Sequence, residues 1–378
     1  VLCILPGLLQ ARTYPDNYAG GHNALHVREL KKGVDSWNQW RRDNPGLRPD
    51  LIGAHIYNMN LTGYNLSNVN FGGEYTNLAT RDTISCEMYN VTFDNANLEG
   101  ANFHRCNLRN VSFKSATLKR ANFKGTHINT ARFDRANLAR ATFGKHIQYS
   151  SYLSNTYFNS ASMVRVNLSD VKFGNAGFKG ANMRSAQLKR IEHYPVMSTI
   201  DFTNAVLNFA DFSGAKLSKA TFSYAKMVRA KFRFVTVNKT KFYKVKSRGA
   251  DFYNVQDKGS SRFDNSDFSG ANFARAILKN TNFQKSDFTD ADFTWVVCEG
   301  RVIFNNAKLY NTKFKNGRLK GVWFQFAKID TATFQTARLD RASFRYANIY
   351  ESNFYAVNLS GADFYKAHIM GGDWRSAN

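Results

Sequence analysis

Large apolar residues recur at every fifth position along most of the chain. Between residues 93 and 143 this rhythm has no slip. The positions are Phe93, Leu98, Phe103, Leu108, Phe113, Leu118, Phe123, Ile128, Phe133, Leu138 and Phe143. Neither an α-helix, with about 3.6 residues per turn, nor a β-strand, with a repeat of about 2, has this period. A strict short period indicates one small structural unit stacked many times.

A small residue stands two positions before each large one, and Asn often lies between them, as in Ala101, Asn102 and Phe103. We therefore expect one large and one small side chain in each quintet to point inward. The other three residues point outward or shape a corner. Quintets taken four at a time make a square coil of about twenty residues, and we predict that parallel backbone hydrogen bonds join successive coils.

The pattern Ala-(Asp/Asn)-(Leu/Phe)-x-x resembles the pentapeptide-repeat family over residues 50–376. The resemblance implies an all-β solenoid, a right-handed quadrilateral parallel β-helix with Leu or Phe at the centre of each face. Residues 25–51 are similar to the N-terminal cap of bacterial, notably cyanobacterial, members of the family. Within this cap Val27, Leu30, Val34 and Trp37 form a helical stripe, which predicts one helix lying over the first coil.

Slips in the five-residue phase divide the chain into segments. The expected segments are an extended arm over 1–22, a helical cap over 23–50 and a β-helix over 51–378, with loop insertions near 72–85, 189–199, 253–262 and 294–303. No Gly/Ser/Pro-rich linker separates the repeat runs, so we read one continuous solenoid. The last coil continues the rhythm through Ile369 and Trp374. Because we expect its strand edges to be uncovered, we predict a contact with another chain there.

Composition indicates the kind of compartment in which the protein is found. The formal net charge is +24, the mean hydropathy is −0.45, and no apolar run approaches the ~18 residues that span a membrane. The cysteines do not form a disulfide framework, which favours a soluble protein in a reducing compartment, either the cytoplasm or an organelle stroma or matrix. The apolar residues 1–9 are read either as the remnant of a cleaved targeting segment or as an arm that docks on a partner.

The sequence contains no pattern typical of catalysis. Its eight histidines lack metal-ligand spacing, and there is neither a nucleophile elbow nor a phosphate-binding loop. We therefore predict no enzyme activity, no metal and no cofactor. The resemblance includes gyrase inhibitors that imitate DNA as acidic rods, but this chain has the opposite charge, so that function is not carried over.

The basic charge points to a candidate partner surface. Residues twenty apart share a face, so Phe103, Phe123, Phe143, Met163 and Met183 are expected to form one column, and their quintets contain no acid. The predicted basic ladder beside this column is Arg105, Lys124, Lys145, Arg165 and Arg184. A second basic patch, diluted by Asp340, is Arg318, Lys320, Arg338 and Arg341.

Two functions from different classes remain open. The first is a non-catalytic structural protein whose basic faces dock on acidic proteins of a large assembly, for example a light-harvesting complex of the phycobilisome type. The alternative is an RNA- or DNA-binding accessory subunit, such as one of an organellar ribosome. The outward aromatic residues Tyr224, Tyr253, Tyr346 and Tyr365 are few, so we expect only weak base-stacking platforms.

Overall fold

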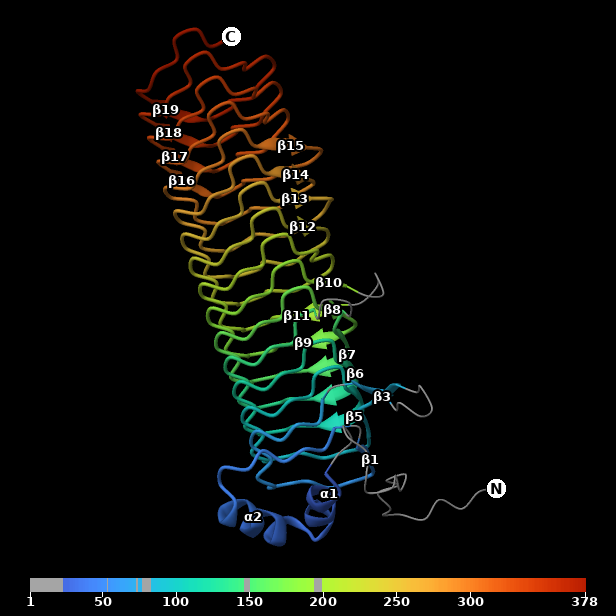
Figure 1. Cartoon of the computed structure of the whole chain (residues 1–378). Coiled ribbons are helices and arrows are strands. Elements are labelled where there is room, and N and C mark those ends of the chain that lie inside the picture. The colour runs from blue at the N-terminus through green and yellow to red at the C-terminus, as the bar shows by residue number, and fades with distance from the viewer. Residues whose placement is uncertain (1–22, 53, 73, 77–82, 146–149, 194–198) are drawn as a thin grey trace, which may run out of the picture. The chain divides into compact units, whose positions relative to one another are not determined.

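The computed structural model describes residues 23–378 apart from short gaps. The gaps are residue 53, residue 73, and residues 77–82, 146–149 and 194–198. The chain divides into two compact units. Unit 1 contains the described residues up to Gln187, and unit 2 contains Leu188–His193 and Thr199–Asn378. Each unit is a parallel β-solenoid, and unit 1 begins with a helical cap (Figure 1), so the predicted fold class is confirmed.

The regular elements are short because each face of a coil contributes only a few residues to a strand. Unit 1 contains α1 (Ala24–Lys31), α2 (Val34–Asp43), β1 (His55–Tyr57), β2 (Glu74–Thr76), β3 (Thr83–Ser85), β4 (Glu87–Tyr89), β5 (Asn107–Ser112), β6 (His127–Arg132), β7 (Tyr152–Tyr157), β8 (Lys172–Phe173) and β9 (Ala176–Gly177). Unit 2 contains β10 (Glu192–His193), β11 (Ile200–Asp201), β12 (Thr236–Val237), β13 (Gln256–Asp257), β14 (Ile277–Lys279), β15 (Val297–Glu299), β16 (Lys308–Tyr310), β17 (Lys328–Asp330), β18 (Asn348–Tyr350) and β19 (His368–Met370).

Parallel pairing between coils sorts the inward residues of unit 1 into four columns, one for each face of the coil. Face A is centred on Leu51, Phe71, Phe103, Phe123, Phe143 and Leu168, and face B on Ile56, Met88, Leu108, Ile128, Leu153 and Phe173. Face C is centred on Leu61, Phe93, Phe113, Phe133, Phe158 and Phe178, and face D on Leu66, Leu98, Leu118, Leu138, Met163 and Met183.

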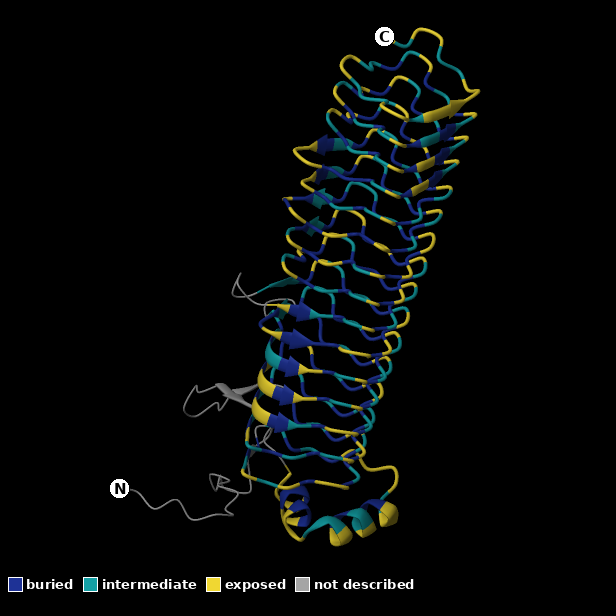
Figure 2. Ribbon diagram, turned by 180° about the vertical axis from the view of Figure 1, so that it is seen from behind, coloured by how far each residue is buried: buried dark blue, intermediate teal, exposed yellow. Residues whose placement is uncertain are grey.

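The core of unit 1 is a set of stacked rings. The Phe123 ring lies parallel to Phe103 and Phe143, with centroids 4.8 and 4.6 Å away, and meets Phe113 and Phe133 edge-on. Both arrangements suit the quadrupole of an aromatic ring. The central residues are fully buried, and so are the small residues two positions before them, while most of the remaining positions reach solvent (Figure 2).

The corners of the coils require left-handed backbone. The second residue after a central one has φ near +60°, for example Gly100, Asn95 and Arg120. This conformation costs a side chain with a Cβ roughly 1–2 kcal/mol, which is why Gly and Asn are favoured there. The tight corner returns the chain for the next face and leaves the side chain outside.

Unit 1 departs from the twenty-residue period at two places. The first is a hairpin in which β2 and β3 pair antiparallel, so that Asn70 pairs with Asn102 in the next coil. The second lies between β6 and β7: Asn107 pairs with His127, but His127 pairs with Tyr152, twenty-five residues on. One whole extra quintet therefore lies in this coil, and it includes the undescribed residues 146–149.

The cap contains two helices where the apolar stripe predicts one. Gly33, with φ of +103°, separates α1 from α2, because a residue in this conformation cannot continue an α-helix. The Trp37 side chain is fully buried, and its Nε1 donates a hydrogen bond of 2.7 Å to the carbonyl oxygen of Asn65. Arg41 donates to the carbonyl oxygens of Leu47 and Ser67. These bonds satisfy backbone groups at the open end of the first coil.

Unit 2 is built in the same way, with single residues added near 253–262 and 294–303: Gln256 pairs with Ile277, and Asn282 pairs with Ile303, twenty-one residues on in each case. An unusual consequence is that Asp257 takes a central, inward position next to Val237 in the pairing of β12 with β13. Asp257 is 2% exposed. It accepts hydrogen bonds from the hydroxyls of Thr281 (2.7 Å) and Ser261 (2.8 Å) and from the backbone N–H of Gly259 (3.0 Å).

Burial raises the pKa of Asp257 above its ordinary value of 3.8, although the hydrogen bonds from Thr281 and Ser261 lower it. A raised pKa in the folded state means that the folded protein holds this proton more tightly than the unfolded chain. The free energy of unfolding contributed by the group is therefore greatest below pH 3.8 and falls as the pH rises through the raised pKa.

We expect Asp257→Asn to remove this titration. The Tm of the wild type minus that of the variant should decrease as the pH rises above 3.8 and through the raised pKa, measured by thermal unfolding at several pH values. Glu299→Gln, which removes an exposed carboxyl group of the same unit, serves as the control. A difference in Tm that stays constant with pH would show that Asp257 does not titrate differently in the folded and unfolded states.

Candidate basic interaction surface

The structure divides the predicted basic ladder between two faces of unit 1. Arg105, Lys124 and Lys145 follow Phe103, Phe123 and Phe143 on face A. Arg165 and Arg184 instead follow Met163 and Met183 on face D, because Asn137 pairs with Ser162 and Ser162 with Asn182.

The extra quintet between β6 and β7 is the physical reason for this correction. It advances every later residue by one face, so that Thr142 pairs with Asn167 and Leu168 follows Phe143 in the column of face A. In the coil next to Lys145, the register therefore places Asp170 where the sequence pattern predicted Arg165. An acid on face A makes this face less basic than expected.

Face D carries the continuous run of basic residues instead. From Leu118 to Met183 its outward positions contain no Asp or Glu. We call the basic side chains at these positions the face-D ladder, and they are Lys119, Arg120, Arg140, Arg165 and Arg184. All five are exposed. Successive coils lie about 4.8 Å apart, so the cationic groups form a dense strip on one surface.

Backbone geometry fixes the register of the ladder. Arg120 N–H donates to the carbonyl oxygen of Ala139, Arg140 N–H to that of Val164, and Arg165 N–H to that of Arg184, over 3.0, 3.0 and 2.9 Å. Arg120, Arg140 and Arg165 all have φ between +58° and +61°. Glycine or asparagine would be less strained at each of these corners, so the three arginines are not explained by the backbone alone.

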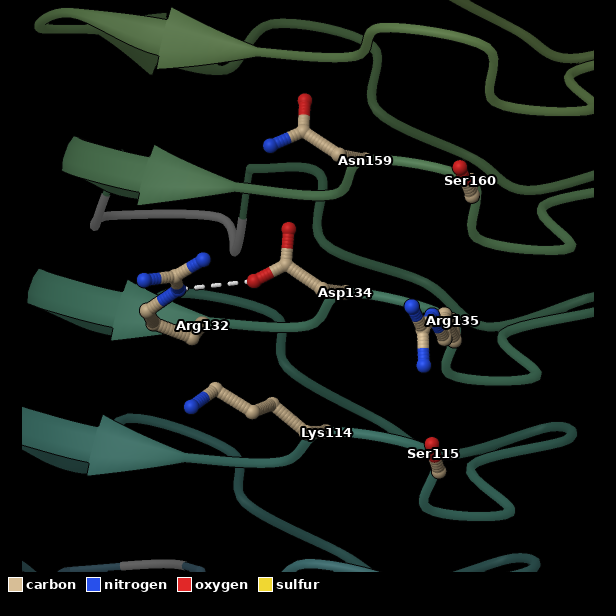
Figure 3. Close-up of a pocket in the computed structure, with 7 residues that line it drawn as sticks. All are labelled: Lys114, Ser115, Arg132, Asp134, Arg135, Asn159 and Ser160. Atoms are coloured by element: carbon tan, nitrogen blue, oxygen red, sulfur yellow. Dashed lines mark hydrogen bonds and ion pairs between the residues drawn. The ribbon is translucent and has the colours of Figure 1, made fainter.

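A shallow pocket of about 490 Å³ extends the basic surface onto face C. It is lined by Lys114, Ser115, Arg132, Asp134, Arg135, Asn159 and Ser160 from three successive coils (Figure 3). Arg132 Nε lies 2.7 Å from Asp134 Oδ2. Arg132 pairs with the one carboxylate, while Lys114 and Arg135 line other parts of the pocket. The pocket therefore offers hydrogen-bond donors to a carboxylate or another small anionic group of a partner.

The second basic patch lies in unit 2. Arg318 pairs with Arg338 in the next coil, and both are exposed, as are Lys320 and Arg341. Lys320 Nζ lies 3.5 Å from Asp340 Oδ2, so one positive charge of the patch is compensated within the unit. Its binding role stays a prediction.

The last coil exposes Ile369, which is 41% accessible. Trp374 occupies a central position and stacks on Phe354, with ring centroids 4.1 Å apart. A contact between these two residues and another chain likewise stays a prediction.

Sequence reasoning missed Lys119, Arg120 and Arg140. The signal that could have found them is the poor quintet between Phe143 and Leu153, where His146 to Ser150 offer no large central residue apart from a polar Gln148. Reading that quintet as an insertion, instead of as one more face, moves Met163 onto the column of Leu138.

Engineered cysteine pairs distinguish the two registers. We expect Arg140→Cys with Arg165→Cys to form a disulfide under mild oxidation, because the register places these residues in adjacent coils about 4.8 Å apart. The pair Lys145→Cys with Arg165→Cys, twenty residues apart, should form none, because its members lie on different faces. Peptide mapping detects the bonds. A disulfide in the second pair only would show that Lys145 and Arg165 lie in adjacent coils, as the twenty-residue register predicts.

The described residues contain no group of three or more His, Cys, Asp or Glu side chains arranged to hold a metal ion. Neither α1 nor α2, the helices of the described chain, is long and apolar enough to cross a membrane.

Comparison with known proteins identifies the repeat. The family model for pentapeptide repeats matches in eight copies, at residues 86–125, 151–190, 198–233, 261–296 and 337–373, which together make half of the chain. No curated protein matches the chain.

Similar solved structures are pentapeptide-repeat proteins of low sequence identity. HetL, involved in heterocyst differentiation regulation in the cyanobacterium Nostoc sp. strain PCC 7120, is 18% identical; the alignment covers 75% of this chain and 94% of HetL, with a TM-score of 0.23. Trypsin-treated QnrB1, a plasmid-mediated fluoroquinolone resistance protein, is 18% identical over 49% of this chain and 83% of its own, with a TM-score of 0.25. Rfr23 from the cyanobacterium Cyanothece 51142 is 19% identical over 47% and 91%, with a TM-score of 0.13.

Proposed function

Because this chain belongs to the pentapeptide-repeat family, we propose that it is a non-catalytic interaction protein that binds acidic protein partners within a larger assembly. The observation that carries the proposal is the face-D ladder, with five exposed cations and no acid at the outward positions of face D from Leu118 to Met183. Like charges this close repel one another. A partner with carboxylates along a matching surface would relieve that repulsion and gain several ion pairs at once.

The pocket on face C supports the same proposal. Lys114, Arg132 and Arg135 supply more charge than Asp134 compensates. An acidic side chain of the partner that enters this pocket would find cations on several sides. The ladder attracts a partner by charge alone. An acidic side chain bound in the pocket would make that contact more specific.

The partner class is a protein and not a duplex nucleic acid for a reason of geometry. The ladder is a single straight strip with a step of about 4.8 Å, which matches the spacing of strands in a sheet. The phosphates of a duplex, in contrast, follow two helical paths with one charge per ~1.7 Å of axis. The proposal specifies acidic proteins as the partners. A light-harvesting complex is one example of an assembly that would supply them.

The experiment that tests the proposal uses fluorescent poly-L-glutamate as the acidic polypeptide. It is titrated with the wild type and with the ladder-reversed variant, which combines Arg120→Glu, Arg140→Glu and Arg165→Glu. We expect binding by the wild type at 50 mM NaCl and weaker binding at 500 mM, because salt screens exposed charges. The ladder-reversed variant should bind more weakly than the wild type, and equal binding would refute the role of face D.

A further inference from the structure

Unit 2 carries exposed aromatic rings along one column of central residues. The column consists of Phe202, Phe222, Phe242, Phe263, Phe283, Phe304, Phe324, Phe344 and Phe364. The outward residues that flank these central rings include two groups of aromatic side chains with cations beside them. We call them the upper cluster (Phe326, Arg345, Tyr346, Tyr365 and Lys366) and the lower cluster (Tyr224, Tyr243, Lys244 and Arg262).

The upper cluster is a short stack of rings in solvent. Phe326 lies parallel to Tyr346, with centroids 4.9 Å apart, and Tyr346 meets Tyr365 edge-on at 5.8 Å. Phe326 is 51% and Tyr365 50% exposed. Among the described residues the Phe326 ring contacts no other ring than Tyr346, and about half of its surface is exposed to a planar ligand.

Cations are held against these rings. Arg345 lies 4.5 Å from the Tyr365 centroid and also pairs with Asp363 Oδ2 at 3.0 Å. Lys366 Nζ lies 5.4 Å from the Tyr365 centroid and 5.9 Å from that of Tyr346. The cluster therefore offers ring faces and positive charge within one small area.

The lower cluster repeats this arrangement. Tyr224 meets Tyr243 edge-on at 5.7 Å, and Lys244 Nζ lies 5.7 and 5.3 Å from their centroids. Arg262 lies 5.3 Å from the Tyr243 centroid and pairs with Asp264. The coils between the clusters add Lys285 and neutral Asn and Gln side chains, and their one acid is the paired Asp264. At about 4.8 Å per coil, roughly 20 Å separates the rings of the two clusters.

We propose that this face of unit 2 binds a single-stranded nucleic acid, with bases stacked on Phe326 and Tyr365 and phosphates held by Lys366 and the cations toward the lower cluster. Single-strand binding combines aromatic platforms with a basic track and needs no sequence readout. A protein partner fits these observations less well, because lysine is depleted from the cores of protein interfaces. Here lysines stand among the rings. The proposal is independent of the face-D ladder, which lies in unit 1.

Binding of a fluorescein-labelled dT15 oligonucleotide at 50 mM NaCl tests the proposal. The ring variant combines Phe326→Ala with Tyr365→Ala. Its matched control combines Phe234→Ala with Trp295→Ala, two rings with exposures of 53% and 55% that follow a different column, that of Phe232 and Phe293. All four rings are exposed, so both variants should fold, which circular dichroism verifies.

We expect the ring variant to bind dT15 at least ten-fold more weakly than the wild type, because each stacked base is worth about 1–3 kcal/mol. The control should stay within about two-fold of the wild type. A duplex of the same length, whose bases are already stacked, should show no dependence on these rings. The comparison is repeated in the ladder-reversed background, so that attraction of phosphates to unit 1 does not hide the effect.

Three results would overturn the inference. The first is that the wild type does not bind dT15 at 50 mM NaCl. The second is that the ring variant and its control lose the same affinity for dT15. The third is that the ring variant loses as much affinity for the duplex as for dT15. Equal loss in the control would mean that Phe326 and Tyr365 have no special role, and equal ring dependence for the duplex would mean that the rings do not act by stacking unpaired bases. None of these results bears on poly-L-glutamate binding by face D, so the two proposals fail separately.

Discussion

Phe123→Asp is expected to abolish the folding of unit 1. The Phe123 ring is fully buried between two parallel rings and two edge-on rings. Removing such a ring alone costs about 3–5 kcal/mol, and the aspartate adds a buried carboxylate that the column offers no cation to pair. Together these terms approach the whole stability of a typical domain, about 5–15 kcal/mol. Circular dichroism melting should show no cooperative transition for this unit.

The neighbouring residue provides the control. Lys124 points outward and is exposed, so Lys124→Asp should change the free energy of unfolding by less than about 0.5 kcal/mol. A cooperative melting curve in Phe123→Asp like that of Lys124→Asp would contradict the inward assignment of the central residues.

The ladder-reversed variant should bind poly-L-glutamate about ten- to a hundred-fold more weakly than the wild type. An exposed ion pair contributes about 0.2–1 kcal/mol, and each reversal removes an attraction and adds a repulsion. At about 0.5–1 kcal/mol per reversal, three reversals amount to about 1.5–3 kcal/mol, which corresponds to roughly ten- to a hundred-fold in Kd.

The reversals should spare the fold, because the side chains are exposed and glutamate tolerates the corner conformation. Glu351 has φ of +41° at a corresponding corner of unit 2. Thermal unfolding of the variant within a few degrees of the wild type would verify this, and it separates loss of binding from loss of structure.

The inward residues were predictable because burial imposes a strict period on them. A polar residue at a central position leaves a buried group unsatisfied, so the columns of Phe and Leu stand out in the sequence. Asp257 is the informative exception: it occupies a central position because Thr281, Ser261 and Gly259 satisfy its oxygens. Partners from the next coil and the same loop cannot be read from a linear pattern.

Which outward residues share a face could be predicted only where the pairing register between coils could be predicted. Arg165 has the phase of the column of Phe143 when residues are counted in twenties, and one inserted quintet transfers it to face D. An insertion of five residues keeps the inward pattern intact, which is why the repeat itself does not reveal it. Similarly, the break at Gly33 leaves the apolar stripe unchanged although it divides the cap into α1 and α2.

The aromatic surface of unit 2 was underestimated for a related reason. Tyr346 and Tyr365 look isolated in the sequence, and Phe326 is counted among the many phenylalanines of the repeat. Only the stacking of coils brings the three rings together with Arg345 and Lys366.

We propose that charge on face D, and not the total charge of the protein, holds the acidic partner. The most direct test compares the Kd of poly-L-glutamate for the ladder-reversed variant with that for a matched variant, Arg229→Glu, Lys239→Glu and Arg275→Glu. These three residues are exposed, have φ between +53° and +59°, and follow three different columns of unit 2. Both variants change the net charge equally. We expect the ladder-reversed variant to bind at least ten-fold more weakly than the matched variant at 50 mM NaCl. Equal Kd values for the two would mean that face D has no special role.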